Sequence, residues 1–331
     1  MIISRTPLRI SFAGGGSDLA AFYRHEPGAV VGVTINKYIY INVNKKFDHQ
    51  IRASYSVTEI VDSVEQLKHQ LIREALKLVG REQSVEITSI SDIPSQGTGL
   101  GSSSAYTTGL LNALYAFTGR FAGAERLARE ACEIEIERCG APIGKQDQYF
   151  SAYGGLKCIQ FNPDETVFVE PVICRHQTVR SLQQRLVMLY TGTTRLAAQV
   201  LREQQANTER DARTRLMLRR MVGLAHDLRA ALLADDLDAF GEALAEGWAL
   251  KRGLASGISS AQIDLWYERA RAAGAVGGKI LGAGGGGFML LYAPEERHEA
   301  IRAALPELRQ VPIAFEPQGS KIIYVEESGD A

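Results

Sequence analysis

The stretch Pro94-Ser-Gln-Gly-Thr-Gly-Leu-Gly-Ser-Ser-Ser-Ala105 joins three alternating glycines to three serines, just before an apolar segment. Alternating glycines permit positive φ angles and close approach of the backbone to a ligand. The serines predict at least one N-cap for a buried helix over residues 105–117. A glycine loop at a helix N-terminus directs free N–H groups and the positive dipole end at one point, which favours phosphate. The alternative is a capped helix after a flexible loop.

Two well-known classes of phosphate-binding protein do not fit this loop. A Walker A loop requires Gly-Lys-Ser/Thr, which is missing, and the chain has no His-Arg-Asp or Asp-Phe-Gly of a protein kinase. A second stretch, Lys279-Ile-Leu-Gly-Ala-Gly-Gly-Gly-Gly-Phe288, formally contains G-x-G-x-x-G. A strand-like segment follows it instead of a helix, so it fails as a dinucleotide fingerprint. We interpret it as a turn that packs closely against other backbone.

The composition limits the class of protein. The chain has 331 residues, of which 45% are hydrophobic and 23% charged, as in an ordinary globular protein. With 37 basic and 38 acidic residues, the formal charge of −1 gives no electrostatic reason for a nucleic-acid partner. No segment approaches the ~18 apolar residues of a membrane span, and the N-terminus has no secretory signal. We therefore expect a cytoplasmic protein without nucleic-acid or membrane partners.

The periodicity of the chain predicts an α+β fold. Residues 30–35 and 38–43 read as two strands of a hairpin, with Asn36-Lys37 as the turn. After Arg175 the pattern becomes mainly helical, rich in Arg, Ala and Leu. Antiparallel-looking strands with segregated helices favour α+β over a doubly wound parallel sheet. We expect two domains, residues 1–178 and 179–331.

Two further segments place charged groups beside flexible backbone. Pro7-Leu-Arg-Ile-Ser-Phe-Ala-Gly-Gly-Gly-Ser-Asp18 carries Arg9 and Asp18 at the two ends of a strand and glycine turn. The segment Glu133-Ile-Glu-Ile-Glu-Arg-Cys-Gly-Ala-Pro-Ile-Gly-Lys-Gln-Asp-Gln148 alternates three glutamates, which cannot share one helix face, so at most two point inward. Asp147 follows a loop punctuated by Gly and Pro, where it could serve in catalysis or cap a helix.

Together, these segments resemble the GHMP kinases, the family of galactokinase, homoserine kinase, mevalonate kinase and phosphomevalonate kinase. The glycine-rich motifs stand in the family's order, and Glu135 precedes Asp147 by the interval that separates the metal-binding glutamate and catalytic aspartate of galactokinase. The ordered set is far more specific than any single motif and covers both halves of the chain. It implies the two-domain GHMP kinase fold, with the active site in the cleft between the domains.

The resemblance also implies a role for each matched residue. Asp147 would accept the proton of the substrate hydroxyl, and Arg9 would polarise the nucleophile and balance charge. Glu135 and Ser103, with Ser102 as the alternative to Ser103, would hold Mg²⁺. The phosphates of ATP would lie on Gly97, Thr98, Gly99, Leu100, Gly101, Ser102, Ser103 and Ser104. Such a site suits phosphoryl transfer, whose loose transition state is stabilised mainly by positioning and by cations.

Within the family, three segments are most similar to the branch that phosphorylates the anomeric hydroxyl of D-glycero-D-manno-heptose 7-phosphate, a step toward GDP-heptose for surface polysaccharides. These segments are Leu8–Leu19, Gly144–Tyr149 and Tyr190–Arg195. Galactokinase has Glu-His where this chain has Gly15-Gly16, which removes two sugar-contacting side chains and opens space. The implied substrate-binding residues are Gly15, Gly16, Ser17, Asp18, Lys145, Asp147 and Arg195, with Lys145 and Arg195 as the candidates for the substrate's phosphate.

The expected partners are therefore ATP and a small sugar phosphate. The alternatives are another sugar-1-kinase, fucokinase-like or galactokinase-like, and a non-catalytic sugar sensor with a GHMP fold. A decarboxylase of a phosphorylated acid also exists among the relatives, but no residue pattern favours it. The Ala- and Arg-rich helices after Leu196 could form a homo-oligomer interface or simply cover the second domain, and we favour the covering role.

Overall fold

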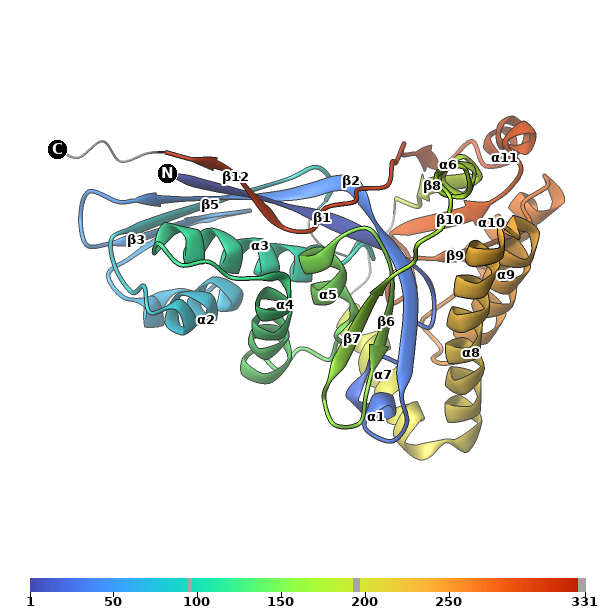
Figure 1. The fold of residues 1–331 in the computed structure, drawn as a ribbon, viewed down its shortest axis with the longest axis horizontal. Helices are drawn as coiled ribbons and strands as arrows, with labels where there is room; N and C mark the ends of the chain where they lie inside the picture. Colours follow the sequence, from blue (N-terminus) through green and yellow to red (C-terminus); the bar gives the residue numbers. More distant parts are fainter. Residues whose placement is uncertain (95–96, 193–196, 327–331) are drawn as a thin grey trace.

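The computed structural model of the chain describes residues 1–94, 97–192 and 197–326, and these residues form two β-sheets with helices packed against them (Figure 1). The first sheet has eight strands in the order β12-β1-β2-β5-β3-β4, and β6 and β7 extend it beside β2. The second sheet has four strands in the order β11-β8-β10-β9. Of the strand pairs, β3 with β5 is parallel and the others are antiparallel. This confirms the predicted α+β class.

The elements have the following bounds. The strands are β1 (Ile2–Ala13), β2 (Gly28–Lys45), β3 (Ile51–Ser54), β4 (Thr58–Val61), β5 (Val85–Ser91), β6 (Leu156–Phe161), β7 (Val167–Pro171), β8 (Leu186–Tyr190), β9 (Gly277–Ile280), β10 (Phe288–Tyr292), β11 (Arg309–Gln310) and β12 (Lys321–Val325). The α-helices are α1 (Ala20–Tyr23), α2 (Gln70–Val79), α3 (Ser102–Phe117), α4 (Ala124–Cys132), α5 (Gln146–Tyr153), α6 (His176–Gln184), α7 (Ala197–Arg210), α8 (Ala212–Ala234), α9 (Leu237–Arg252), α10 (Ala261–Ala272) and α11 (His298–Ala304). Two 3₁₀ turns, η1 (Val64–Gln66) and η3 (Glu295–Arg297), and a π-helical segment, η2 (Glu133–Arg138), complete them.

The predicted hairpin over residues 30–43 is wrong, because these residues belong to the single strand β2. Strand β1 pairs with β2 along its length, and one register shift between Pro7 and Leu8 accommodates the Asn36-Lys37 region. The backbone N–H of Asn36 donates to the Ala314 carbonyl at 2.8 Å, and its side-chain oxygen accepts from the Ala314 N–H at 2.7 Å. Long-range pairing therefore satisfies the polar groups that a local turn would otherwise have used.

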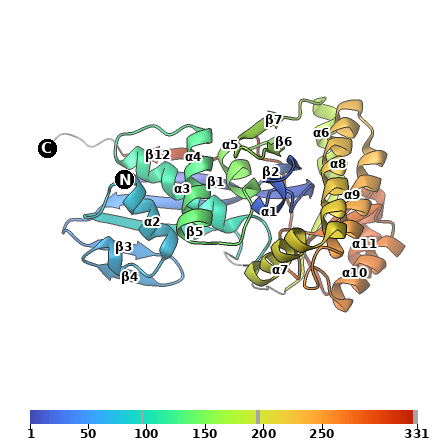
Figure 2. The same ribbon diagram turned by 90° about the horizontal axis from the view of Figure 1, so that it is seen from below.

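The hydrophobic core is continuous between the two halves of the chain. Helices α2 to α5 lie on one face of the first sheet, α9 and α10 contact β9 of the second sheet, and α8 packs between α9 and strands β1 and β2 (Figures 1 and 2). Phe12 of β1 packs edge-to-face on Phe240 of α9, with ring centroids 5.2 Å apart, and Phe240 in turn contacts Tyr292 of β10. Strand β12 returns from the C-terminal end to pair with β1. The predicted boundary at residues 178/179 falls inside α6 and stays a prediction.

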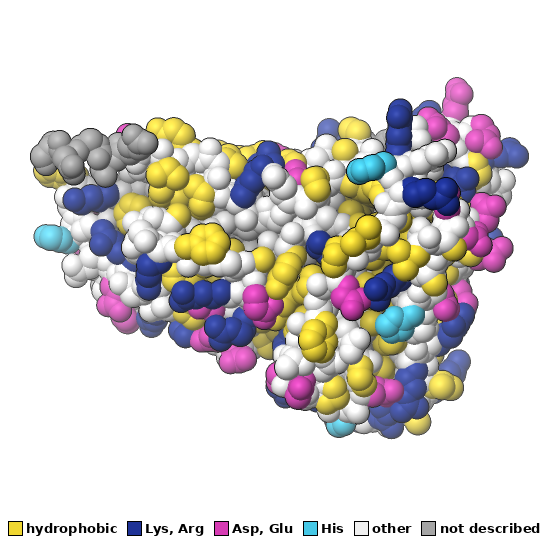
Figure 3. Space-filling model, viewed as in Figure 1, with side chains coloured by type: hydrophobic (Ala, Val, Ile, Leu, Met, Phe, Trp, Pro, Cys, Tyr) yellow, Lys and Arg dark blue, Asp and Glu magenta, His cyan; other side chains and the backbone are white. Residues whose placement is uncertain are grey.

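The surface carries charges of both signs. On the face shown in Figure 3, basic and acidic side chains are interspersed over both halves. Among the helices of the described residues, none combines the length and the apolar character that crossing a bilayer demands.

Two glycine-rich turns meet backbone to backbone where the halves join. Gly99 and Gly282 have φ angles of 76° and 67°. A Cβ on Gly282 would clash with the Cα of Gly99, and a Cβ on Gly99 would lie 2.7 Å from the carbonyl carbon of Leu281. Gly287 would likewise meet the carbonyl carbon of Thr98 at 2.7 Å. The second glycine stretch is therefore the closely packed turn that the sequence predicts, and its partner is the first.

Gly282→Ala should destabilise the fold more than an alanine at a glycine with the same backbone but free space. Gly80 has φ 73°, and a Cβ on it would have nothing within 4 Å, so Gly80→Ala isolates the backbone strain, which costs about 1–2 kcal/mol. Gly282→Ala adds overpacking and should cost about 1–3 kcal/mol more. Urea denaturation of both variants measures the difference. Equal losses would show that the two turns can separate freely.

Candidate active site

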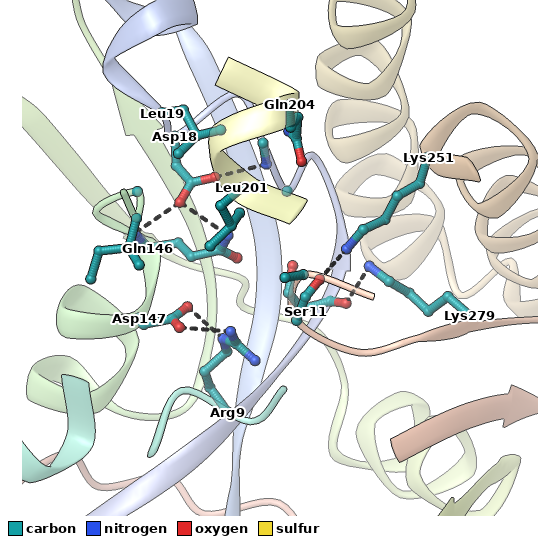
Figure 4. Close-up of a pocket in the computed structure, with 16 residues that line it drawn as sticks. Arg9, Ser11, Asp18, Leu19, Gln146, Asp147, Leu201, Gln204, Lys251 and Lys279 are labelled. Carbon is teal, nitrogen blue, oxygen red and sulfur yellow. Dashed lines mark hydrogen bonds and ion pairs between the residues drawn. The ribbon is translucent and has the colours of Figure 1, made fainter. Parts of the chain in front are cut away.

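Most of the described residues that the sequence predicts for the site converge where β1, the N-terminus of α3, η2 and the N-terminus of α5 meet the glycine turn after β9. Two adjoining cavities open here. The loop cavity, of about 580 Å³, is lined by most of the 97–104 loop together with Glu135 and the 282–286 turn. The inner cavity lies deeper and is lined by Ser11, Gly15, Gly16, Asp18, Gln146, Gln204, Lys251 and Lys279 among others (Figure 4). Arg9 and Asp147 line both cavities.

Arg9 and Asp147 form a two-point ion pair at the junction of the two cavities (Figure 4). The Nε and Nη2 groups of Arg9 donate to Oδ1 and Oδ2 of Asp147, each at 2.7 Å, and Nη1 donates to the Gly99 carbonyl at 2.6 Å. This arrangement orients the carboxylate rigidly. Arg9 is buried, whereas 23% of the Asp147 side chain is exposed. Asp147 can therefore still accept a hydrogen bond or a proton from a group inside the cavities.

The glycine loop has the conformation that the sequence predicts, but its cap differs. Gly97, Gly99 and Gly101 all adopt positive φ, at 67°, 76° and 76°. Helix α3 begins at Ser102, and its N-cap is Gly101 with no side-chain cap. The predicted serine cap is therefore wrong: the serines form the first turn of α3 and line the loop cavity. Because no serine oxygen caps the helix, the first N–H groups of α3 remain available to an anion.

The metal candidates Glu135 and Ser103 are in direct contact. Ser103 Oγ donates to Glu135 Oε1, and Gln148 Nε2 donates to Oε2 at 2.6 Å. Glu135 lies in η2, a π-helical segment of the kind often found at functional sites. It is buried, whereas Glu133 is half-buried and Glu137 exposed, as the alternation predicts. Burial raises the pKa of Glu135 to about 7, against the lowering effect of its hydrogen bonds. A nearby cation would favour the ionised form.

An aromatic cavity of about 430 Å³ adjoins the loop cavity. Ser102 and Ser103 line both spaces. The aromatic part comes from Tyr55, His69 and Tyr106, in which the His69 ring lies 4.5 Å from Tyr55 and 5.3 Å from Tyr106, centroid to centroid. No motif in the sequence points to these residues, because they come from separate loops and helices that only the folded chain brings together.

Asp18 links the glycine turn after β1 to the start of α5. Its Oδ1 accepts from the Gly16 N–H at 2.8 Å, and its Oδ2 accepts from Gln146 Nε2 at 3.0 Å. The Gln146 N–H also approaches Oδ2, at 3.3 Å. Burial raises the pKa of Asp18. These bonds hold the residue immediately before Asp147, so Asp18 both lines the inner cavity and positions the ion pair beside it.

Two buried lysines of the inner cavity are absent from the residues that the sequence predicts for the site. Lys251 of α9 donates to the Gly282 carbonyl, and Lys279 of β9 donates to the carbonyls of Ser11 at 2.8 Å and Phe12 at 3.1 Å. Both are at most 5% exposed, and neither forms an ion pair with a carboxylate within the described residues. Burial lowers the pKa of Lys251 to about 8, and it also lowers the pKa of Lys279. Lys279 opens the quoted glycine stretch, but Lys251 sits in an ordinary helical pattern.

The remaining predicted residues lie as follows. Gly15 and Gly16 line the inner cavity, whereas the Ser17 hydroxyl donates to the Gly14 carbonyl at 2.8 Å and stabilises the turn. Leu100 is buried beneath the loop and lines neither cavity. Lys145 lines neither cavity: it pairs with Glu165 and lies 4.6 Å above the Tyr23 ring. Arg195 lies outside the described residues.

Comparison with known proteins gives a consistent result. The family models described as "GHMP kinases N terminal domain" and "GHMP kinases C terminal" match residues 67–155 and 228–309, together just over half of the chain. A D-glycero-alpha-D-manno-heptose 7-phosphate kinase of Campylobacter jejuni is 28% identical over 97% of this chain and 98% of its own length. A bifunctional fucokinase/GDP-fucose pyrophosphorylase of Arabidopsis thaliana is 26% identical over 91% of this chain, which spans 31% of that larger protein.

Among solved structures, a D-glycero-D-manno-heptose 1-phosphate kinase from Bacteroides thetaiotaomicron superimposes with a TM-score of 0.82. It is 27% identical, and the match covers 99% of this chain and 100% of that one. These matches confirm the resemblance that the four sequence segments indicate.

Proposed function

Because this chain belongs to the GHMP kinase family and is a phosphotransferase, we propose that it transfers the γ-phosphoryl group of ATP to the anomeric hydroxyl of D-glycero-D-manno-heptose 7-phosphate. The product would be the 1,7-bisphosphate, for GDP-heptose and surface polysaccharide synthesis. The observation that carries the proposal is the Arg9–Asp147 pair, which lies where a phosphate-binding loop and a separate polar cavity meet.

The loop cavity and the aromatic cavity together suit a nucleoside triphosphate. The phosphates would bind the N–H groups of the glycine loop and the first turn of α3. The base would lie in the aromatic cavity near His69 and Tyr106, which the shared Ser102 and Ser103 connect to the loop. Rings at this position offer stacking surface to a purine.

Glu135 and Ser103 fit a Mg²⁺ ion by the chemistry of their oxygens. A buried carboxylate with a raised pKa is electrostatically incomplete until a cation joins it, and a hydroxyl oxygen beside it is the second hard ligand. When bound, Mg²⁺ would neutralise part of the negative charge of the triphosphate. Gln148 would keep the carboxylate oriented through its bond to Oε2.

In the proposed reaction, Asp147 accepts the proton of the attacking hydroxyl. The hydroxyl oxygen then forms a bond to the γ-phosphorus while the bond from that phosphorus to the bridging oxygen of ADP breaks. Arg9 supports this step in two ways. Its two-point contact holds the carboxylate in one orientation, and its positive charge lies close to the developing charge on the transferred oxygens.

The inner cavity encloses about 70 Å³ and adjoins the loop cavity at Arg9 and Asp147, and its lining groups suit the hydroxyls and the anionic group of a sugar phosphate. Ser11 Oγ and Gln146 Oε1 are buried without hydrogen-bond partners among the described residues and can bind sugar hydroxyls. Lys251 and Lys279 are buried amines without a carboxylate ion-pair partner in the described residues, and their charged forms are costly unless an opposite charge compensates them. A phosphate on the substrate supplies that compensation. Lys251 and Lys279 are therefore our candidates for phosphate recognition in place of Lys145, while Arg195 lies outside the described residues and stays a prediction.

A fucokinase-like activity on an unphosphorylated sugar is the second candidate. The similarity to the bifunctional fucokinase/GDP-fucose pyrophosphorylase of Arabidopsis thaliana favours it. The buried lysine pair favours the phosphorylated sugar, since fucose would leave both ammonium groups without an anion. A panel of sugars and sugar phosphates in an ADP-release assay separates the two candidates, and ³¹P NMR of the product identifies the phosphorylated position.

Asp147→Asn should lower kcat about 10²–10⁴-fold, because the amide keeps the shape of the side chain but cannot accept the proton. Binding of ATP, measured by calorimetry, should change little, because the loop and the aromatic cavity are intact. The unfolding temperature should be recorded as well, since the Arg9 contact weakens. An unchanged kcat would show that Asp147 is not the base.

Lys251→Met should selectively weaken turnover of the phosphorylated sugar. We expect kcat/KM for heptose 7-phosphate to fall about 10–100-fold, as for loss of a charged hydrogen bond, and that for unphosphorylated heptose to change far less. Lys145→Met is the matched comparison, because its side chain points away from both cavities and should leave the ratio of the two substrates unchanged. A selective loss in Lys145→Met instead would restore the sequence-based assignment.

A further inference from the structure

Gln204 of α7 is a buried polar residue with no task in the reaction described so far. It is 2% exposed and lines the inner cavity, and α7 belongs to the second half of the chain. Its Nε2 is buried and has no hydrogen-bond partner among the described residues. A buried N–H without a partner costs about 1–3 kcal/mol, so few persist in native proteins without a ligand or water to satisfy them.

Gln204 lines the same inner cavity as two other residues with unsatisfied polar atoms (Figure 4). Ser11 Oγ from β1 and Gln146 Oε1 from α5 are also buried without partners in the part of the chain that the structure describes. The three side chains come from three elements that are far apart in the sequence, and they offer an amide donor, an amide acceptor and a hydroxyl that can do both. Each sugar hydroxyl needs one acceptor and can take a donor, so this set is complementary to a polyhydroxylated ring.

The position of Gln204 explains one of the two glycines after β1. Gly16 has φ +107°, and a Cβ there would clash with Nε2 of Gln204 and lie 3.2 Å from Cδ2 of Leu218. The space beside residue 16 is therefore occupied by the Gln204 amide and not open to the sugar. A Cβ on Gly15 would lie 3.6 Å from Ser11 Oγ and from Gln146 Nε2, an ordinary contact distance. The expectation that both glycines open space is corrected: Gly15 borders the open part, and Gly16 admits Gln204.

We propose that Gln204 is a specificity-determining residue, whose Nε2–H donates to one oxygen of the bound sugar. This inference rests on the proposed sugar kinase function and deepens it. A side chain of the second half would bond the sugar next to Gly15 and Gly16, where the first half offers no side chain. A site built to bond a particular oxygen rejects an analogue that lacks it, because its own polar group is then left unpaired. Gln204 therefore makes the enzyme selective for sugars that present an acceptor oxygen at this point.

Kinetics of Gln204→Met on the substrate and on its monodeoxy analogues tests the proposal. Methionine keeps the length of the side chain but has no donor. We expect kcat/KM for the full sugar to fall about 10–100-fold, mainly through KM, with KM for ATP unchanged. One deoxy analogue should be a poor substrate for the wild type and as good as the full sugar for the variant. The other analogues should keep their wild-type ratios. Gln205→Leu is the control, since Gln205 is the next residue of α7 and lines none of the cavities described.

The outcomes separate this inference from the proposed function. If the Gln204→Met variant discriminates among the analogues as the wild type does, Gln204 does not determine specificity. The kinase function stands in that case. A wild-type enzyme that phosphorylates no sugar overturns the proposed function and the inference with it. If Gln204→Met unfolds at a markedly lower temperature than the wild type, Gln204→Leu provides the same loss of the donor in a shorter side chain, and its analogue ratios decide in the same way.

Discussion

The contact between the two glycine turns is the constraint on which the site depends. Gly99 and Gly282 approach so closely that no side chain fits between them, and this contact joins the loop before α3 to the turn after β9. Arg9 donates to the carbonyl of Gly99, and Lys251 donates to the carbonyl of Gly282, so one cation from each half is anchored to the same contact. The loop cavity and the inner cavity meet beside it. Separating the turns would therefore move the phosphate-binding loop, the ion pair and the buried lysines apart together.

The electrostatics of the site are unbalanced in a way that the net charge of −1 conceals. At its outer end, Glu135 is a buried acid whose pKa is raised to about 7, and a bound cation would stabilise its ionised form. At its inner end, Lys251 and Lys279 are buried bases with lowered pKa values, and a bound anion would stabilise their protonated forms. Arg9 and Asp147 lie between and neutralise each other. A substrate complex that brings a divalent cation to one end and a phosphate to the other satisfies both.

The part of this site that the sequence predicts is the part made by local backbone. Patterns within a few residues point to the glycines of the 97–101 loop, to Glu135 on an alternating segment and to Asp147 after a Gly/Pro loop. Lys251, Gln204 and the aromatic cavity leave none, because helix packing and strand register bring them in from distant elements. Lys145 is instructive, because it is near Asp147 in sequence but pairs with Glu165 and lines neither cavity. Likewise, the Asn36-Lys37 pair looks like a turn until β1 and the 314 region supply its partners.

The origin of the side chains divides the work between the two halves of the chain. The groups assigned to phosphoryl transfer, Arg9, Ser103, Glu135 and Asp147, all lie on β1, α3, η2 and α5, which surround the first sheet. Of the groups assigned to the sugar and its phosphate, Ser11 and Gln146 lie on β1 and α5, whereas Gln204, Lys251 and Lys279 lie on α7, α9 and β9. A change of substrate can thus arise from substitutions in second-half elements, which contact the first half at the glycine turns, at β1 through Lys279 and Phe240, and at Gly16 through Gln204. Selectivity can change while the ion pair and the phosphate loop keep their geometry, since no hydrogen bond of Arg9 or Asp147 involves α7, α9 or β9 in the described residues.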